Sequence, residues 1–231
     1  MSFNVTRYLT FEISHTCDLA ASHPWCPVSH PDRYKFGDRI YNLNDRIILD
    51  FYRWCKFTHG FRGIILWHQY NEPIHQLPRI RNLMAEMKRI DPHQPFQLTT
   101  NSRPDVEGFD IVHFTDYSNP NTLHDDRILN AEGEGLPYSD LRLRQGMCHR
   151  GLQWEIPIDN HGNWCLCCAD WRCEQSVGNI FTDNWEMLYA RFDERSRSIR
   201  WSDEQTYNSL PRLCRACLHV TPNLHRTGSV F

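Results

Sequence analysis

The first half of the chain alternates short apolar segments with segments of helical periodicity. Residues 8–14 alternate apolar and polar side chains, with the apolar ones on one face, which is typical of a strand. Shorter apolar runs predict three further strands, at residues 63–67, 96–100 and 109–115. The pattern therefore predicts a sheet whose strands are separated by longer connections.

Two amphipathic helices are predicted in these connections. Apolar side chains recur at three- and four-residue spacing over residues 38–59 and again over residues 77–90. Gly60 ends the first helix and Pro92 stops the second. The order strand, helix, strand, helix, strand implies right-handed crossovers and a parallel sheet, with functional sites at the carboxyl ends of its strands.

The second half of the chain has a different character. Residues 119–139 are polar and rich in turn formers, which indicates a long connection, and a short strand is predicted at 140–144. Seven of the ten cysteines lie between residues 148 and 217. We therefore expect an α/β part over residues 1–145 and a small cysteine-rich module, organised by metal, over residues 146–231.

Composition narrows the class of protein. A chain of 231 residues can bury a core without disulfides. Its net charge of −3 gives no electrostatic reason to expect nucleic acid or a membrane as partner. There is no signal-peptide pattern and no apolar window of about 18 residues, so we expect a cytoplasmic protein. In that compartment clustered cysteines bind metal more often than they form disulfides.

Four cysteines of the second half have spacings that suit one metal site. Cys214 and Cys217 form a CxxC turn, which lets two thiolates reach one metal centre. Gly162 is suited to a hairpin turn that brings Cys148 and Cys167 to the same side. Four thiolates fit either tetrahedral zinc or a four-iron cluster. The other cysteines of this region exceed fourfold ligation and are interpreted as buried or incidental thiols: Cys165, Cys168 and Cys173.

At these residues the sequence resembles the radical SAM superfamily with a C-terminal SPASM or twitch module. The matching stretch is C-x13-G-x4-C-C-x-D from Cys148 to Asp170, followed by VGNI at 177–180, Trp185 and LCRAC at 213–217. In that family such a pattern holds an auxiliary four-iron four-sulfur cluster. The resemblance thus implies one auxiliary cluster, with structural zinc as the alternative. Its ligands would be Cys148, Cys167, Cys214 and Cys217.

A second resemblance follows the first predicted strand, where family members carry a C-x3-C-x2-C motif. Here the spacing is C-x5-H-x2-C, with Cys17, His23 and Cys26. The resemblance implies a second four-iron cluster, whose open iron binds the amino and carboxylate groups of S-adenosylmethionine. An imidazole ligand in place of thiolate would raise the reduction potential. The alternative interpretation of His23 is a surface loop histidine.

Three further motifs resemble cofactor-binding positions of the family. The second strand leads into HQYNEP where the family has GGEP, which implies that Glu72, beside Asn71, binds the amino group of S-adenosylmethionine. The alternative is a helix-capping turn. Asn101 lies in TTNS, which resembles the family's TNG, and Thr115 lies where a polar residue of the fourth strand approaches the ribose.

The expected fold is α/β, a partial radical-SAM-like (β/α) barrel with a small iron–sulfur module. The resemblance covers residues 8–217, but the chain has room for fewer strands than the six strand–helix units of a full barrel. The barrel is therefore expected to be truncated, and a partner chain or self-association would complete it.

The resemblance implies an enzyme that cleaves S-adenosylmethionine to a 5′-deoxyadenosyl radical and modifies a peptide or small-molecule substrate. Such an enzyme requires an electron donor. The first alternative is a non-catalytic iron–sulfur or zinc-binding descendant that acts through protein interactions. The second is a nucleic-acid-binding zinc protein, which only the CxxC turn and the Arg-rich residues 191–200 favour, and that segment is more simply a solvated helix face.

Overall fold

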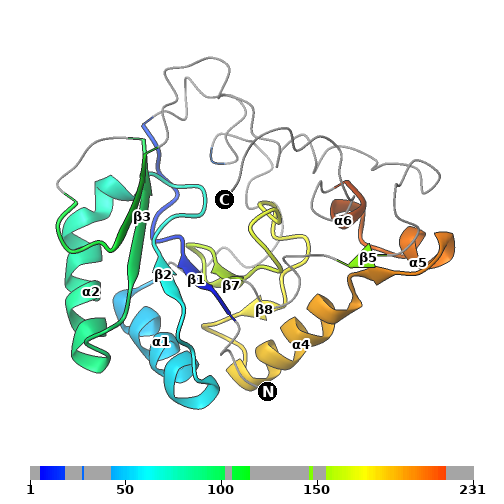
Figure 1. Cartoon of the computed structure of the whole chain (residues 1–231), viewed down its shortest axis with the longest axis horizontal. Helices are drawn as coiled ribbons and strands as arrows, with labels where there is room; N and C mark the ends of the chain where they lie inside the picture. Colours follow the sequence, from blue (N-terminus) through cyan, green and yellow to red (C-terminus); the bar gives the residue numbers. More distant parts are fainter. Residues whose placement is uncertain are drawn as a thin grey trace.

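The computed structural model describes residues 6–18, 28, 43–101, 106–114, 146–147 and 155–216 (Figure 1). Several predicted features lie outside these residues: the strand at 140–144 and the site residues His23, Cys26, Thr115, Cys148 and Cys217. Among the described residues, no helix combines the length and the apolar character needed to cross a membrane.

A mixed seven-stranded sheet runs through the molecule in the order β4-β3-β2-β1-β6-β7-β8. Its strands are β1 (Tyr8–Phe11), β2 (Ile64–Leu66), β3 (Phe96–Thr100), β4 (Ile111–Phe114), β6 (Glu155–Ile158), β7 (Asn163–Trp164) and β8 (Gly178–Asn179). The five strands from β4 to β6 are parallel, and β6, β7 and β8 are antiparallel. The predicted α/β class is therefore confirmed, and the sheet is mixed rather than wholly parallel. Within the described residues the sheet ends at β4 and β8 and does not close into a barrel.

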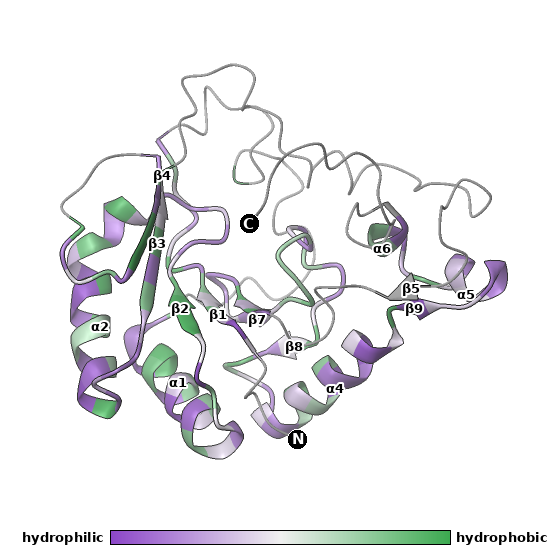
Figure 2. Ribbon diagram, in the orientation of Figure 1, coloured by the Kyte–Doolittle hydropathy of each residue, from purple (hydrophilic) through white to green (hydrophobic). Residues whose placement is uncertain are grey.

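Three long helices, α1 (Asp45–His59), α2 (Leu77–Ile90) and α4 (Trp185–Ser198), follow one another beside the sheet (Figure 1). The remaining elements are short: η3 (Pro73–Gln76), α5 (Glu204–Asn208), α6 (Arg212–Ala216), and β5 (Gly146–Met147) paired with β9 (Arg200–Trp201). Figure 2 shows hydrophilic and hydrophobic positions side by side along α1 and α2, as expected for amphipathic helices that cover a sheet.

Local capping sets the ends of α1. The Asn44 side chain accepts a hydrogen bond from the Ile47 amide at 3.0 Å, so Asn44 is the N-cap and has extended backbone. The prediction of a helix from residue 38 is therefore wrong at residues 43 and 44. At the other end Gly60 has φ 69°, the left-handed conformation that lets glycine end a helix.

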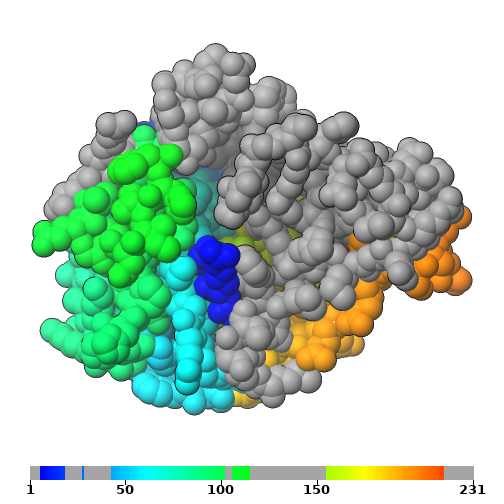
Figure 3. Space-filling model, viewed as in Figure 1, coloured from blue at the N-terminus to red at the C-terminus, as the bar shows by residue number. Residues whose placement is uncertain are grey.

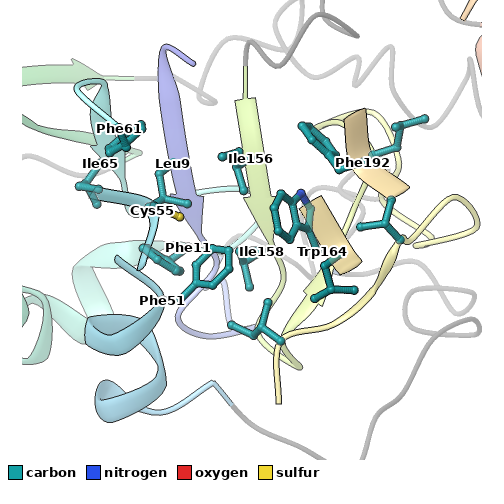
Figure 4. Close-up of a cluster of buried hydrophobic side chains, with 14 of the residues drawn as sticks. Leu9, Phe11, Phe51, Cys55, Phe61, Ile65, Ile156, Ile158, Trp164 and Phe192 are labelled. Carbon is teal, nitrogen blue, oxygen red and sulfur yellow. The ribbon is translucent and has the colours of Figure 1, made fainter. Parts of the chain in front are cut away.

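One hydrophobic core joins the two halves of the chain. Figure 4 shows side chains of β1, α1 and β6 converging, among them Leu9, Phe51 and Ile158, next to Trp164. The Trp164 ring lies 5.4 Å from the ring of Phe51 and 5.1 Å from that of Phe192, centroid to centroid. On the surface, the blue atoms of residues 6–18 lie between the cyan and green first half and the orange second half (Figure 3). The first and second halves therefore fold against each other.

The sheet also crosses the predicted boundary between residues 145 and 146. Strand β6 pairs in parallel with β1, with Tyr8 opposite Glu155. The Thr10 hydroxyl donates a buried hydrogen bond of 2.8 Å to the Glu155 carboxylate, between residues 145 positions apart. The described residues after 155 thus extend the sheet, while a separate cysteine-rich module remains a prediction.

Candidate functional site

The carboxyl ends of β1, β2 and β3 meet at one edge of the sheet, as expected for neighbouring parallel strands. The loop after β2 is joined to the segment after β1 because the Glu72 amide donates to the Thr16 carbonyl at 2.9 Å. Four of the predicted site residues lie at these strand ends: Cys17, Asn71, Glu72 and Asn101.

Glu72 is a buried carboxylate at this edge. It is 3% exposed, and its carboxylate accepts hydrogen bonds from the Asn101 amide at 2.9 Å and from the Thr100 hydroxyl. It also accepts from the Ile74 amide at 3.2 Å, so Glu72 is the N-cap of η3. The alternative prediction of a capping turn is therefore confirmed, because Glu72 caps η3. Three donors leave about one of the four acceptor positions of a carboxylate for a ligand.

Asn101 joins Glu72 to Cys17. Its backbone donates to the Glu72 carboxylate, and its side-chain amide lies 4.0 Å from the Cys17 sulfur, within hydrogen-bonding range for sulfur. Asn71 is 2% exposed and its side-chain amide donates to the Ser14 hydroxyl at 3.4 Å. A thiol, a carboxylate and two amides therefore occupy the ends of three adjacent strands, a donor set suited to a metal cluster and a polar ligand.

The structure describes two of the four cysteines predicted for the auxiliary cluster. Cys167 follows β7 and is half-buried, and Cys214 lies in α6 and is buried. Both pack against the main hydrophobic core. The predicted hairpin is present as β6 and β7, and Gly162 in its turn has φ 81°. The other two predicted ligands lie outside the described residues.

Asp170 organises the segment that carries Cys167. Its carboxylate accepts from the amides of Glu174 and Gln175, each at 2.9 Å, and its own amide donates to the Cys167 carbonyl at 3.0 Å. Burial raises the pKa of Asp170 to about 7, although the two amide donors act in the opposite direction. The Asp of the C-C-x-D motif is therefore a buried loop-forming residue.

Tyr70 connects the two candidate sites. Its hydroxyl donates to the Cys168 carbonyl, and its ring forms a small buried cluster with Trp171 and Leu213, against which Val28 packs. The loop before Glu72 is thereby joined to the cysteine-rich segment and to α6. Tyr70 stands in the HQYNEP stretch, where the resembling motif is GGEP, and that motif comparison does not indicate this contact.

A third group contains two cysteines that the sequence indicated as buried or incidental thiols, and both are buried. Asp159, Cys165 and Cys173 are buried, and their donor atoms all lie within 4.8 Å of one another. In the sequence, the spacing between the two cysteines matches no metal-binding turn. Asp159 lies in DNHGN, which indicates an ordinary hairpin turn. Only the folded hairpin brings these residues together.

Comparison with solved structures shows that the chain has the same fold as BtrN. The crystal structure of BtrN in complex with AdoMet and 2-DOIA matches with a TM-score of 0.63 at 17% identity, over 97% of this chain and 95% of that chain. BtrN in an open conformation matches with a TM-score of 0.52 at 14% identity, over 92% of each chain. No protein-family model and no curated protein sequence matches the chain. At these identities the likeness establishes the fold alone.

Proposed function

We propose that this protein is a radical SAM-type enzyme with its active site at the carboxyl ends of β1, β2 and β3. The observation that carries the proposal is the connection from Cys17 through Asn101 to Glu72 at this edge. It joins the first predicted cluster ligand to the predicted ligand of the S-adenosylmethionine amino group. The shared fold with BtrN, which was crystallised with AdoMet, supports the same assignment.

Cys17, His23 and Cys26 would hold a four-iron cluster with one open iron. When reduced, such a cluster supplies the electron that cleaves S-adenosylmethionine to a 5′-deoxyadenosyl radical. Glu72 holds the ligand ammonium with its remaining acceptor position, and its fixed hydrogen bonds orient the carboxylate. Burial of Glu72 at 3% exposure strengthens that contact because water competes less for the charge.

The auxiliary SPASM- or twitch-type cluster would be held by Cys148, Cys167, Cys214 and Cys217. One of these ligands, Cys167, is next in the sequence to Cys168, whose carbonyl accepts a hydrogen bond from Tyr70, so the loop that carries Glu72 contacts the auxiliary-cluster segment. We propose that this second cluster relays electrons from a donor or shapes the binding site of a peptide or small-molecule substrate.

The test is anaerobic reconstitution followed by iron analysis and an assay for 5′-deoxyadenosine with dithionite and S-adenosylmethionine. We expect about eight iron atoms per chain, from two four-iron clusters. Deoxyadenosine formation should be lost in the double variant Cys17→Ala Cys26→Ala and kept in Cys55→Ser, a matched change at a buried cysteine of α1. Iron for a single cluster, together with no deoxyadenosine above the double variant, contradicts the proposal.

A second candidate is a non-catalytic descendant of the same fold. It is favoured by the loop before Glu72, where buried Tyr70 and Asn71, 3% and 2% exposed, replace two family glycines that permit close approach to the cofactor. Calorimetry with S-adenosylmethionine decides between the candidates. A descendant that has lost the chemistry shows no binding to the reconstituted protein, whereas the enzyme binds it in a manner that depends on Glu72.

A further inference from the structure

Three donor groups converge behind the β6–β7 hairpin, and none of them belongs to either predicted cluster set. The Cys165 and Cys173 sulfurs are 3.1 Å apart, and the Cys173 sulfur lies 3.2 Å from Asp159 Oδ2. Exposed fractions are 0% for Asp159 and Cys165 and 3% for Cys173. The group is therefore closed off from solvent in the described structure.

The separations are closer to those of a metal site than to those of a disulfide. Tetrahedral zinc with Zn–S bonds of about 2.3 Å and a Zn–O bond of about 2.0 Å places two sulfurs about 3.7 Å apart, and sulfur and oxygen about 3.5 Å apart. A disulfide requires about 2.0 Å between the sulfurs. The sulfurs of Cys165 and Cys173 would thus separate by roughly 0.6 Å to bind zinc, but would approach by roughly 1 Å to form a disulfide.

Asp159 is oriented before any ion binds. Its Oδ1 accepts from the amides of His161 at 2.9 Å and Asn163 at 2.8 Å, and its Oδ2 accepts from the Asn163 side chain at 2.9 Å. Secondary contacts of this kind fix the direction of metal-binding carboxylates. The donors that the described residues give to Asp159 are all neutral, while buried charges in proteins are generally paired or coordinate a metal.

The backbone of Cys173 points to the same conclusion. Among the described residues it is the non-glycine residue with positive φ, at 55°. Such a conformation costs on the order of 1 kcal/mol and persists where the surroundings require it. Here a turn closed by the Cys173 amide to the Asp170 carbonyl, at 2.9 Å, directs the sulfur back toward Cys165.

We propose that Asp159, Cys165 and Cys173 bind one divalent cation of the zinc class. Two thiolates and a carboxylate form a donor set that zinc accepts, and a fourth ligand would complete its tetrahedral coordination. The ion would fasten the β6–β7 hairpin to the segment that carries Cys167, independently of whether the chain performs radical chemistry. Its function is then to hold the cysteine-rich segment against the sheet.

The experiment measures zinc and iron in the anaerobically reconstituted full-length protein, with X-ray absorption at the zinc edge. We expect about one zinc per chain, with two sulfur ligands at about 2.3 Å and lighter ligands at about 2.0–2.1 Å. Asp159→Asn, Cys165→Ser and Cys173→Ser should each weaken zinc binding at least tenfold and keep the iron content. Cys55→Ser, at a buried cysteine of α1, should change neither metal.

Each other outcome overturns the proposal. Less than about 0.2 zinc per chain after growth with added zinc means that there is no such site. Loss of iron in the three variants assigns these residues to the auxiliary cluster, and a Cys165–Cys173 disulfide in intact-mass analysis assigns them to a redox pair. If the variants do not fold, the X-ray absorption spectrum of the wild-type protein decides. Two sulfur ligands agree with the proposed site, whereas four sulfur ligands would place the zinc on the cysteines predicted for the auxiliary cluster and overturn the proposal.

Discussion

Replacing Glu72 with Gln separates its two roles, the cap that the structure shows and the ligand contact that we propose. Gln retains an oxygen for the Thr100 hydroxyl and the Ile74 amide, but it turns an NH2 group toward the Asn101 amide. One charge-assisted hydrogen bond is lost, and two donors then face each other. Each effect costs about 1–2 kcal/mol, so we expect a loss of roughly 2–4 kcal/mol in unfolding free energy.

For a chain of this length that loss lowers the melting temperature by roughly 5–15 °C, which leaves the protein folded at 20 °C. The assays are thermal unfolding of the reconstituted protein under nitrogen and calorimetric titration with S-adenosylmethionine. Loss of the carboxylate–ammonium contact, worth about 1.5–3 kcal/mol, should weaken binding about 10- to 100-fold. The stability effect alone would leave the affinity unchanged.

Thr100→Val is the matched control. It removes one donor to the same carboxylate and keeps the charge, so stability should fall by about 1–2 kcal/mol. The affinity for S-adenosylmethionine should stay within about threefold of the wild-type value, since 0.6 kcal/mol is about the effect of a small reorientation. If Glu72→Gln and Thr100→Val change the affinity equally, or if neither changes it, the ligand role of Glu72 is refuted and only the cap remains.

Three further predictions concern the framework of the site. Gly162→Ala should lower stability by about 1–3 kcal/mol in thermal unfolding, because its Cβ would lie 2.5 Å from the Phe181 ring. Gly108 also has a positive φ, but the Cβ of Gly108→Ala would lie 3.7 Å from the Met84 side chain, an ordinary contact, so this change should cost less. Tyr70→Phe should cost about 1 kcal/mol, measured in the same way, since the Cys168 carbonyl loses its donor. The hydrogen bond from Lys56 holds the pKa of Asp91 below 3.8, so the stabilisation from this ion pair is present above pH 3.8 and is lost as the pH falls through the lowered pKa. Asp91→Asn should therefore be less stable than wild type at neutral pH, and the difference between the two proteins should shrink in unfolding experiments at acidic pH.

Local patterns were sufficient for the first half of the fold. Helix α2 and strand β3 have the predicted bounds, because the amphipathic stripe over residues 77–90 and the apolar run over residues 96–100 are complete within their own segments. The start of α1 was misplaced because the cap at Asn44 depends on a single side chain, which the apolar periodicity does not register.

Long-range pairing accounts for what the sequence could not predict. Strand β6 is four residues long and contains Pro157, so it carries no alternating pattern, and its pairing with β1 depends on contacts such as Thr10 with Glu155. The approach of Cys165 to Cys173 depends on the left-handed backbone of Cys173, which no spacing rule indicates. The cluster motifs could be read because the family resemblance supplied their spacing.

The replacement of the family glycines before Glu72 has a structural explanation. A glycine pair leaves the loop after the second strand open, whereas Tyr70 fills that space and joins Trp171 and Leu213 in a buried cluster. The same loop is bonded to the segment after β1 through Thr16, so the candidate cofactor site and the cysteine-rich segment support each other. Loss of the Tyr70 contact should therefore affect both the loop that carries Glu72 and the cysteine-rich segment, although Tyr70 and Cys168 lie 98 residues apart in the sequence.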